Sequence, residues 1–132
     1  MMSQNSGWIA ALGRLLIAAI FLFSGFGKIM APEATQAYIA SAGLPLPIVG
    51  YGIAILVEVG GGILLVVGYQ ARAVALIMAL FTIAAALAFH NQLADQNQLI
   101  HFMKNLAMAG GLLQVVAFGA GSMSIDGRGA PR

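Results

Sequence analysis

The most constraining feature of this sequence is its long stretches without charge. Residues 47–68 contain one charged side chain, Glu58, and residues 73–89 contain none. An α-helix rises about 1.5 Å per residue, so roughly 20 such residues cross the hydrocarbon core of a bilayer. Only 8% of the 132 residues are Asp, Glu, Lys or Arg, against about 25% in soluble domains. Lipid must therefore be the solvent for most of the surface of this chain.

Four stretches are long and apolar enough to predict membrane-spanning helices. They cover about residues 8–30, 47–68, 73–89 and 103–119. The runs are continuously apolar, whereas the strands of a transmembrane barrel alternate apolar and polar residues. Three spans follow the first, so a cleaved signal peptide is rejected as well. We therefore expect an all-α fold, an integral membrane bundle of four transmembrane helices that forms a single domain over residues 1–132.

The connection between the first two spans carries the signals of a short helix. Pro32 suits the first position of a helix, and the carboxylate of Glu33 suits the positive end of the helix dipole. Gly43 is placed to end this helix, and Pro45 follows shortly after. We expect a short interfacial helix here, lying on the membrane surface.

The remaining connections and the positive charges set the expected topology. Residues 69–72 form a tight link, residues 90–100 a polar loop, and residues 121–132 a polar, Gly-rich tail that is expected to be mobile. Positive residues favour the cytoplasmic side of a membrane. The side with the termini carries Arg14, Arg72, Arg128 and Arg132, and the other side carries Lys28 and Lys104. Both termini are therefore predicted to face the cytoplasm.

Each charged helical face also carries small residues. Arg14 and Lys28 are at helical spacing with Gly25, and Glu58 is at helical spacing with Gly62. The third and fourth spans follow the same pattern. Small residues let transmembrane helices approach closely, and charges inside a membrane turn toward the bundle interior. The charged faces are therefore predicted to be the faces on which the helices contact one another.

Counting residues along spans of alternating direction sorts the polar side chains into two clusters. Glu58 lies near mid-span and is expected to be buried and paired with Arg14 or Arg72, which enter from the same side. Such a carboxylate either fixes the helix register or acts as a ligand or proton-relay group. The arginines are interpreted as compensating charges or headgroup anchors, and the lysines as interface anchors. The second cluster contains Lys28, Lys104, Asn105, His90 and His101.

The composition disfavours several kinds of function. The chain has no cysteine, which removes disulfides, iron–sulfur clusters and thiolate metal sites. His90 and His101 flank a polar loop without the spacing of metal ligands on one helix face, so no metal site is predicted. The net charge of +2 comes from scattered residues, so no nucleic-acid partner is expected.

Five stretches, taken in order, carry a family resemblance. They are Arg14-Leu15-Leu16 leading to Ser24-Gly25-Phe26-Gly27-Lys28, then Glu58-Val59-Gly60-Gly61-Gly62, Ala71-Arg72-Ala73-Val74, Phe102-Met103-Lys104-Asn105 and Gly119-Ala120-Gly121-Ser122. Together they resemble the DoxX family of small bacterial membrane proteins. The resemblance implies four helices in the bacterial cytoplasmic (inner) membrane, and it carries over no catalytic residue. It implies a buried polar or ligand site at the matching positions Arg14, Lys28, Glu58, Arg72, Lys104 and Asn105.

Three functions are compatible with such a site, and whether the chain is an enzyme stays open. The first is a quinone-interacting subunit of a membrane redox or oxidative-stress system, because a quinone headgroup needs polar donors in a pocket reached from lipid. No covalently bound cofactor is expected, so a membrane or soluble redox protein would supply the electrons. The second function is a non-catalytic scaffold for a redox partner. The third is a small proton-coupled transporter, assembled as a homo-oligomer.

Overall fold

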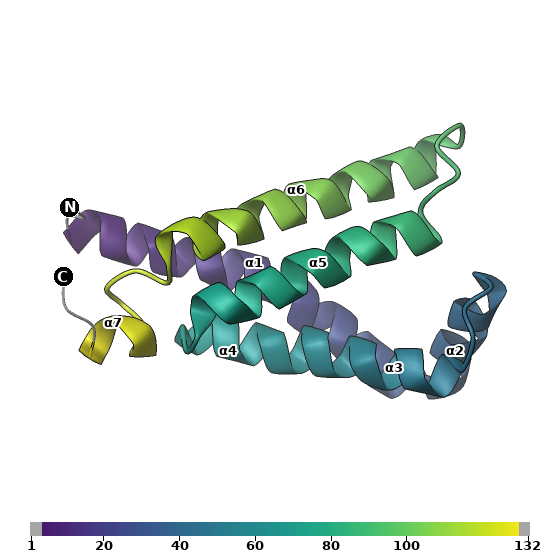
Figure 1. The fold of residues 1–132 in the computed structure, drawn as a ribbon, viewed down its shortest axis with the longest axis horizontal. Coiled ribbons are helices and arrows are strands. Elements are labelled where there is room, and N and C mark those ends of the chain that lie inside the picture. The colour runs from purple at the N-terminus through teal and green to yellow at the C-terminus, as the bar shows by residue number, and fades with distance from the viewer. Residues whose placement is uncertain (1–3, 130–132) are drawn as a thin grey trace.

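The computed structural model describes residues 4–129, which fold as helices joined by short connections (Figure 1). Four helical stretches are long and apolar enough to cross a membrane. One of them is continuous through three elements, because the π-helix η1 joins α3 to α4. The elements are α1 (Gln4–Met30), α2 (Pro32–Ser41), α3 (Pro47–Ile55), η1 (Leu56–Gly60), α4 (Gly61–Val67), α5 (Ala71–Phe89), α6 (Gln96–Phe118) and α7 (Ile125–Gly129).

These helices confirm the predicted all-α membrane bundle and correct one boundary. Helix α2 occupies the first connection, as expected, and Gly43 follows its end with a φ of 84°. Helix α6 begins at Gln96 and not near residue 103, so residues 96–100 of the expected polar loop are helical. The reason is a cap that apolar patterning does not reveal, because the Asp95 side chain accepts a hydrogen bond from the backbone N–H of Asn97. The helix thus starts among polar residues.

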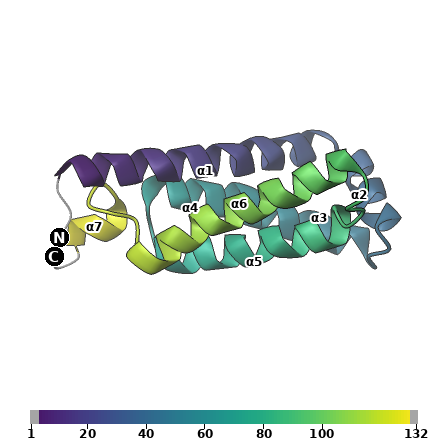
Figure 2. The ribbon, with the colours of Figure 1, turned by 90° about the horizontal axis from the view of Figure 1, so that it is seen from above.

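The helices form two antiparallel pairs that meet closely at one end and separate toward the other. Helix α6 packs mainly on α5, and α1 packs mainly on η1 and α4. The start of α1, the turn between α4 and α5, and α7 lie at one end of the bundle, which we call the terminal end (Figures 1 and 2). Helix α2 and the α5–α6 connection lie at the opposite end, the α2 end. Toward it α5 and α6 diverge from α3 (Figure 1), which leaves room between the pairs.

Small residues on three of the four spans make the close contacts that the sequence predicted. Ala18, Ala75 and Ala79 are buried in the core. A Cβ atom added at Gly25 would lie 2.5 Å from the Cγ2 of Val59, so α1 and η1 approach too closely for any larger residue. On α6 the prediction is confirmed only in part, because Val115 of the charged face is buried whereas Lys104 and Ala107 are exposed. That helix also packs through Ala109 and Leu112.

Arg14 holds the terminal end of the bundle together. Its side chain is 2% exposed, and its guanidinium donates hydrogen bonds to the backbone carbonyls of Leu65 and Val66 in α4 and of Ala120 and Met123 after α6. The last carbonyls of a helix have no partner within it. The expected roles of Arg14, as a partner for Glu58 or a headgroup anchor, are therefore wrong. The guanidinium donates four hydrogen bonds to carbonyl oxygens from two segments.

The C-terminal segment docks on the same end and is not the mobile tail that was expected. The Asp126 carboxylate accepts hydrogen bonds from the backbone N–H groups of Gln70 and Ala71, each at 2.8 Å, and so caps the N-terminus of α5. Its own N–H donates to the carbonyl of Gly68 at 3.0 Å. Residues 130–132, which include the Arg132 of the charge count, lie outside the described residues.

We expect Arg14→Gln to lower the thermal stability of the protein in mild detergent by several kcal/mol. A glutamine can reach at most some of these carbonyls, and each buried acceptor left without a donor costs about 1–3 kcal/mol. The matched control is Arg72→Gln, because Arg72 is exposed at the same end and surface changes usually stay within about 0.5 kcal/mol. Equal melting temperatures for the two variants would contradict the assigned role of Arg14.

Candidate functional site

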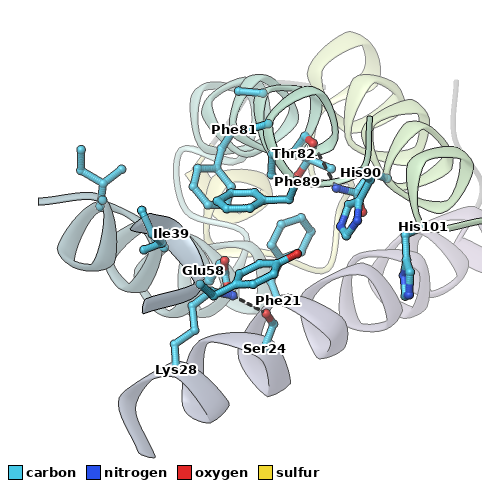
Figure 3. A pocket seen from close by; sticks show the side chains of 18 of the residues that line it. Phe21, Ser24, Lys28, Ile39, Glu58, Phe81, Thr82, Phe89, His90 and His101 are labelled. Atoms are coloured by element: carbon cyan, nitrogen blue, oxygen red, sulfur yellow. Dashed lines mark hydrogen bonds and ion pairs between the residues drawn. The ribbon is translucent and has the colours of Figure 1, made fainter. Parts of the chain in front are cut away.

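A cavity of about 580 Å³ lies where the two helix pairs separate, toward the α2 end (Figure 3). Residues of α1, α2, α3, η1, α5 and α6 line it, and most of these residues are apolar. A cavity of this kind, apolar with a few convergent polar groups, is the usual form of a small-molecule site. Its polar lining residues are Ser24, Lys28, Thr35, Tyr38, Glu58, Thr82, His90, His101, Lys104 and Asn105.

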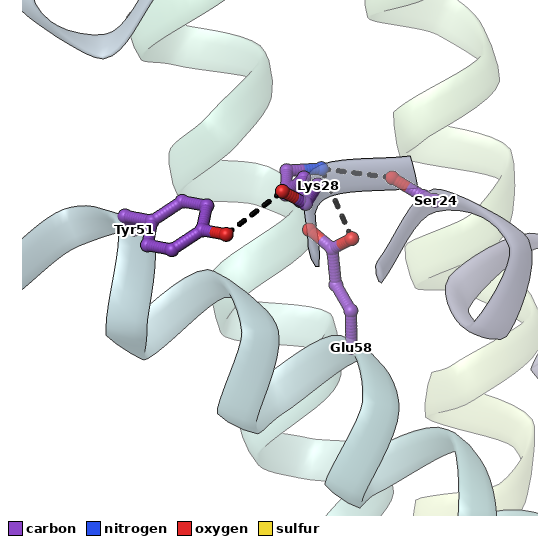
Figure 4. Close-up of polar contacts among 4 residues, drawn as sticks. All are labelled: Ser24, Lys28, Tyr51 and Glu58. Carbon is purple, nitrogen blue, oxygen red and sulfur yellow. Dashed lines mark hydrogen bonds and ion pairs between the residues drawn. The ribbon is translucent and has the colours of Figure 1, made fainter. Parts of the chain in front are cut away.

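A buried ion pair between Lys28 and Glu58 lies in the wall of this cavity (Figure 4). The Nζ of Lys28 is 3.0 Å from the Oε1 of Glu58, and the glutamate is 4% exposed. Lys28 also donates a hydrogen bond to the Oγ of Ser24 at 2.8 Å. The hydroxyl of Tyr51 donates to the carbonyl oxygen of Lys28 at 2.9 Å, which fixes the end of α1 beside α3. The ammonium group therefore has two oxygen partners inside the bundle.

The predicted burial of Glu58 is confirmed, and its predicted pairing with Arg14 or Arg72 is wrong. Counting residues placed Glu58 nearer the arginines, but close packing at Gly25 brings η1 against α1 just one helical turn before Lys28. A lysine stem of four methylenes can reach inward from there. The Glu58 carboxylate therefore belongs to the polar cluster that contains Lys28, which the sequence placed at the opposite side of the membrane.

Glu58 sits in the middle of the π-helix η1, Leu56–Gly60. A π-helix is rare and occurs mostly as a single wide turn inside an α-helix, frequently at a functional site. Its wider turn changes the direction of the side chains it contains. No spacing in the sequence indicated this turn, because an apolar helix with three successive glycines after the glutamate reads as an ordinary α-helix.

The structure brings four of the six predicted site residues to this cavity. Besides the ion pair, these are Lys104, which is exposed, and Asn105, whose Nδ2 donates to the carbonyl of Thr82 at 3.2 Å. Arg14 and Arg72 lie at the terminal end instead. Arg72 occupies the first turn of α5, exposed and with its guanidinium against Gly119. The fold therefore does not bring all six residues together in one site.

Two aromatic stacks lie near the α2 end, one between the two histidines that the sequence placed in one cluster and one that had no signal in the sequence. The rings of His90 and His101 stack with centroids 5.0 Å apart, and those of Tyr38 and Phe89 do so at the same distance. Burial lowers the pKa of His90, as do its neighbours His101 and Lys104, so this imidazole is neutral at neutral pH. Within residues 4–129 no three His, Asp or Glu side chains gather as metal ligands would.

Of the cavity residues that the sequence did not single out, Ser24 had a usable signal. It precedes Lys28 by four residues, which is one helical turn, so the two side chains share a face. Thr82 had none, because a lone threonine in an apolar span usually bonds its own helix. Here the Thr82 hydroxyl does donate to the carbonyl of Met78 at 2.7 Å.

Removing one member of the ion pair should cost more stability than removing both. Glu58→Ala leaves a partly buried ammonium group, and such a loss costs about 3–5 kcal/mol in soluble proteins. The cost here should be at the lower end, because the Lys28 side chain is 28% exposed and can turn toward headgroups. The double variant Lys28→Met with Glu58→Leu should regain most of the lost thermal stability. Additive losses in this double-mutant cycle would show that the two charges do not interact.

Comparison with known proteins fits this architecture. The DoxX family model matches residues 9–91, a range that contains both members of the ion pair. The chain is 38% identical over 118 residues to the inner membrane protein YqjF of Escherichia coli (strain K12), a match that covers 87% of each chain. It is 33% identical over 122 residues to the inner membrane protein YphA of the same strain, covering 89% of this chain and 87% of the relative.

No solved protein structure gives a significant match. The inner-membrane relatives and the four apolar helices support a multi-pass location in an inner membrane. A family model that matches well over half of the chain, together with two relatives aligned over most of it, decides the family. The chain belongs to the DoxX family.

Proposed function

We propose that this protein binds a quinone in the cavity and serves as a quinone-interacting subunit of a bacterial membrane redox or oxidative-stress system. The observation that carries the proposal is the Lys28–Glu58 pair, whose carboxylate is buried, in a mostly apolar cavity of about 580 Å³. A quinone ring and its isoprenoid tail need apolar surface, and its two carbonyl oxygens need hydrogen-bond donors. The cavity offers both.

Lys28 is the donor best placed to meet a quinone carbonyl. An ammonium group has three N–H donors, and the structure gives two of them the oxygens of Ser24 and Glu58. The third is free to point toward a ligand. Because Glu58 is buried beside it, a proton can move between the carboxylate, the ammonium group and an oxygen of the ligand as charge develops there.

Reduction of a quinone to a quinol takes two electrons and two protons. In this proposal the electrons come from a redox protein, in the membrane or soluble, and this chain contributes the binding site and a proton path. The α2 end and the α5–α6 connection provide polar surface for such a partner, since the connection holds Asn91, Gln92 and Asp95, all exposed. Because the partner supplies the electrons, this chain needs no covalently bound cofactor.

The same ion pair also suits a proton-coupled transporter, which is the second candidate. A buried acid paired with a lysine is a common element of proton relays in membranes. Four spans offer little room for a pathway, so this function would need a homo-oligomer. Quinone binding distinguishes the two candidates, and a protein that binds neither quinone nor a transported solute would fit the scaffold.

Quinone binding should depend on the ion pair and not on the arginines of the terminal end. We expect the purified protein to bind a short-chain quinone, measured by calorimetry in detergent, and Glu58→Gln and Lys28→Met to weaken the affinity at least tenfold, about 1.4 kcal/mol. Arg72→Gln is the matched control and should bind like the parent, because Arg72 lies away from the cavity. A parent protein without measurable affinity would refute the proposal, as would a Glu58→Gln variant with unchanged affinity.

We also propose that both termini face the cytoplasm. The start of α1 and α7 lie at the same end of the bundle (Figures 1 and 2), where Arg72 and Arg128 are exposed. At the α2 end, Lys28 turns into the bundle to pair with Glu58, which leaves Lys104 as the exposed basic side chain. Arg14 no longer counts, since it is buried, but the excess of positive charge stays on the same side.

A fusion of the C-terminus to alkaline phosphatase, which is active only outside the cytoplasm, tests this orientation. We expect the fusion to be inactive in cells and a fluorescent-protein fusion at the same place to be bright. The physical reason is the charge bias, so Arg72→Gln combined with Arg128→Gln should weaken the preference. An active phosphatase fusion on the parent chain would reverse the assignment.

A further inference from the structure

The mouth of the cavity carries a positive charge that the protein does not neutralise. Two lysines and one glutamate line the cavity, and Glu58 is paired with Lys28. Within residues 4–129, Lys104 has neither an ion pair nor a hydrogen bond to any acid. The lining therefore has a net charge of about +1, and the unpaired charge of Lys104 is available to a partner of opposite sign.

The side chains around Lys104 suit an anion. His101 precedes it by three residues on α6, so the two share a face, and the ring of His90 stacks on that of His101. Both imidazoles are lining residues (Figure 3). A neutral imidazole offers one N–H donor, and an ammonium group offers three. Charge-assisted donors of this kind bind phosphate and carboxylate oxygens.

The positions of His101 and Lys104 along α6 place both side chains at the edge of the hydrocarbon core. The helix begins with the polar residues Gln96, Asn97 and Gln98, which belong at headgroup level. His101 follows Gln98 by about one turn and Lys104 by nearly two, which is roughly 9 Å of helix axis. A lysine at that depth can extend back toward the headgroups. The anion that reaches it would come from the boundary between headgroups and acyl chains.

Behind the basic mouth the cavity is apolar. Ile20, Ile53, Phe81 and Ala85 are among its lining residues, contributed by three different helices. A free inorganic anion would make no use of this surface, whereas a hydrocarbon chain would gain by covering it. The two features, an uncompensated cation at headgroup depth and an apolar space behind it, are complementary to one molecule with an acidic head and a long chain.

We propose that the cavity mouth binds an anionic lipid, with its acidic group at Lys104 and His101 and its hydrocarbon chain inside the cavity. The acidic group is the phosphate of an anionic phospholipid or the carboxylate of a fatty acid, which present the same chemistry to these donors. The proposal goes beyond quinone binding and does not depend on it, because the anion contacts α6 whereas the quinone is assigned to the Lys28–Glu58 pair. Both ligands would use the apolar space of the same cavity, so each should exclude the other.

Native mass spectrometry of the full chain in detergent, titrated with phosphatidylglycerol, phosphatidylcholine or oleate, tests the proposal. The parent should prefer phosphatidylglycerol to phosphatidylcholine. Lys104→Gln should weaken phosphatidylglycerol binding about fivefold, the usual effect of one basic residue at a membrane surface, and should leave phosphatidylcholine binding unchanged. Competition between oleate and phosphatidylglycerol for the parent supports a shared anion site, and tighter binding of one identifies the natural source.

Three further variants distinguish a specific lipid site from general adsorption to headgroups. Arg72→Gln removes an exposed cation at the opposite end, and an equal loss in it and in Lys104→Gln would overturn the proposal in favour of adsorption. Ala85→Trp fills the cavity without changing charge, so phosphatidylglycerol binding should fall in a variant that still unfolds cooperatively. Glu58→Gln should keep the lipid preference whether or not it loses quinone, so the two proposals can fail separately.

Discussion

Leu65 near the end of α4 and Ala71 at the start of α5 are fully buried, so their backbone groups need hydrogen-bond partners inside the protein. At the terminal end of this bundle two ionised side chains meet that requirement from a distance in sequence. Arg14 supplies donors to the carbonyls that end α4, and Asp126 supplies acceptors to the N–H groups that begin α5. The tight turn between the two helices is thus enclosed by opposite charges. The hydrogen bonds to this turn therefore hold α1 and the C-terminal segment in place at this end of the bundle.

The hydrogen bonds that fix the terminal end have a consequence for the α2 end of the bundle. Glycine and alanine contacts draw α1, η1 and α4 together, and α5 with α6 forms a second close pair. With both pairs tied at the terminal end, their divergence opens a space at the α2 end. The Lys28–Glu58 pair lies in that space, where it costs desolvation that a purely structural bundle would avoid by using apolar residues. The cost is the reason to regard the pair as part of a functional site.

Much of this fold could be predicted from the sequence, because the length of an apolar stretch is itself a physical constraint. The spans, helix α2 and the burial of Glu58 follow from hydropathy, proline and glycine positions, and the cost of a charge in lipid. The partner of Glu58 does not follow, since residue counting gives depth to within about a turn and several cations lie within that range. Nor does the docking of Asp126, because a polar, Gly-rich tail has the same composition whether it caps a helix or remains free.

The π-turn at Glu58 also sets the phase of everything that follows it in the second span. A π-turn holds one residue more than an α-turn, and one residue corresponds to about 100° of rotation. In a plain α-helix Ala54 and Leu65, eleven residues apart, would share a face to within about 20°. The extra residue turns them apart by roughly 100°, so Ala54 lines the cavity whereas Leu65 packs in the core. The wide turn takes up the extra residue locally, so deleting one residue from η1 would restore a plain α-helix, re-aim the side chains of the turn and leave the face of α4 unchanged. Homologous chains should consequently be able to lose one residue here without a change in the surface of α1 that faces α4.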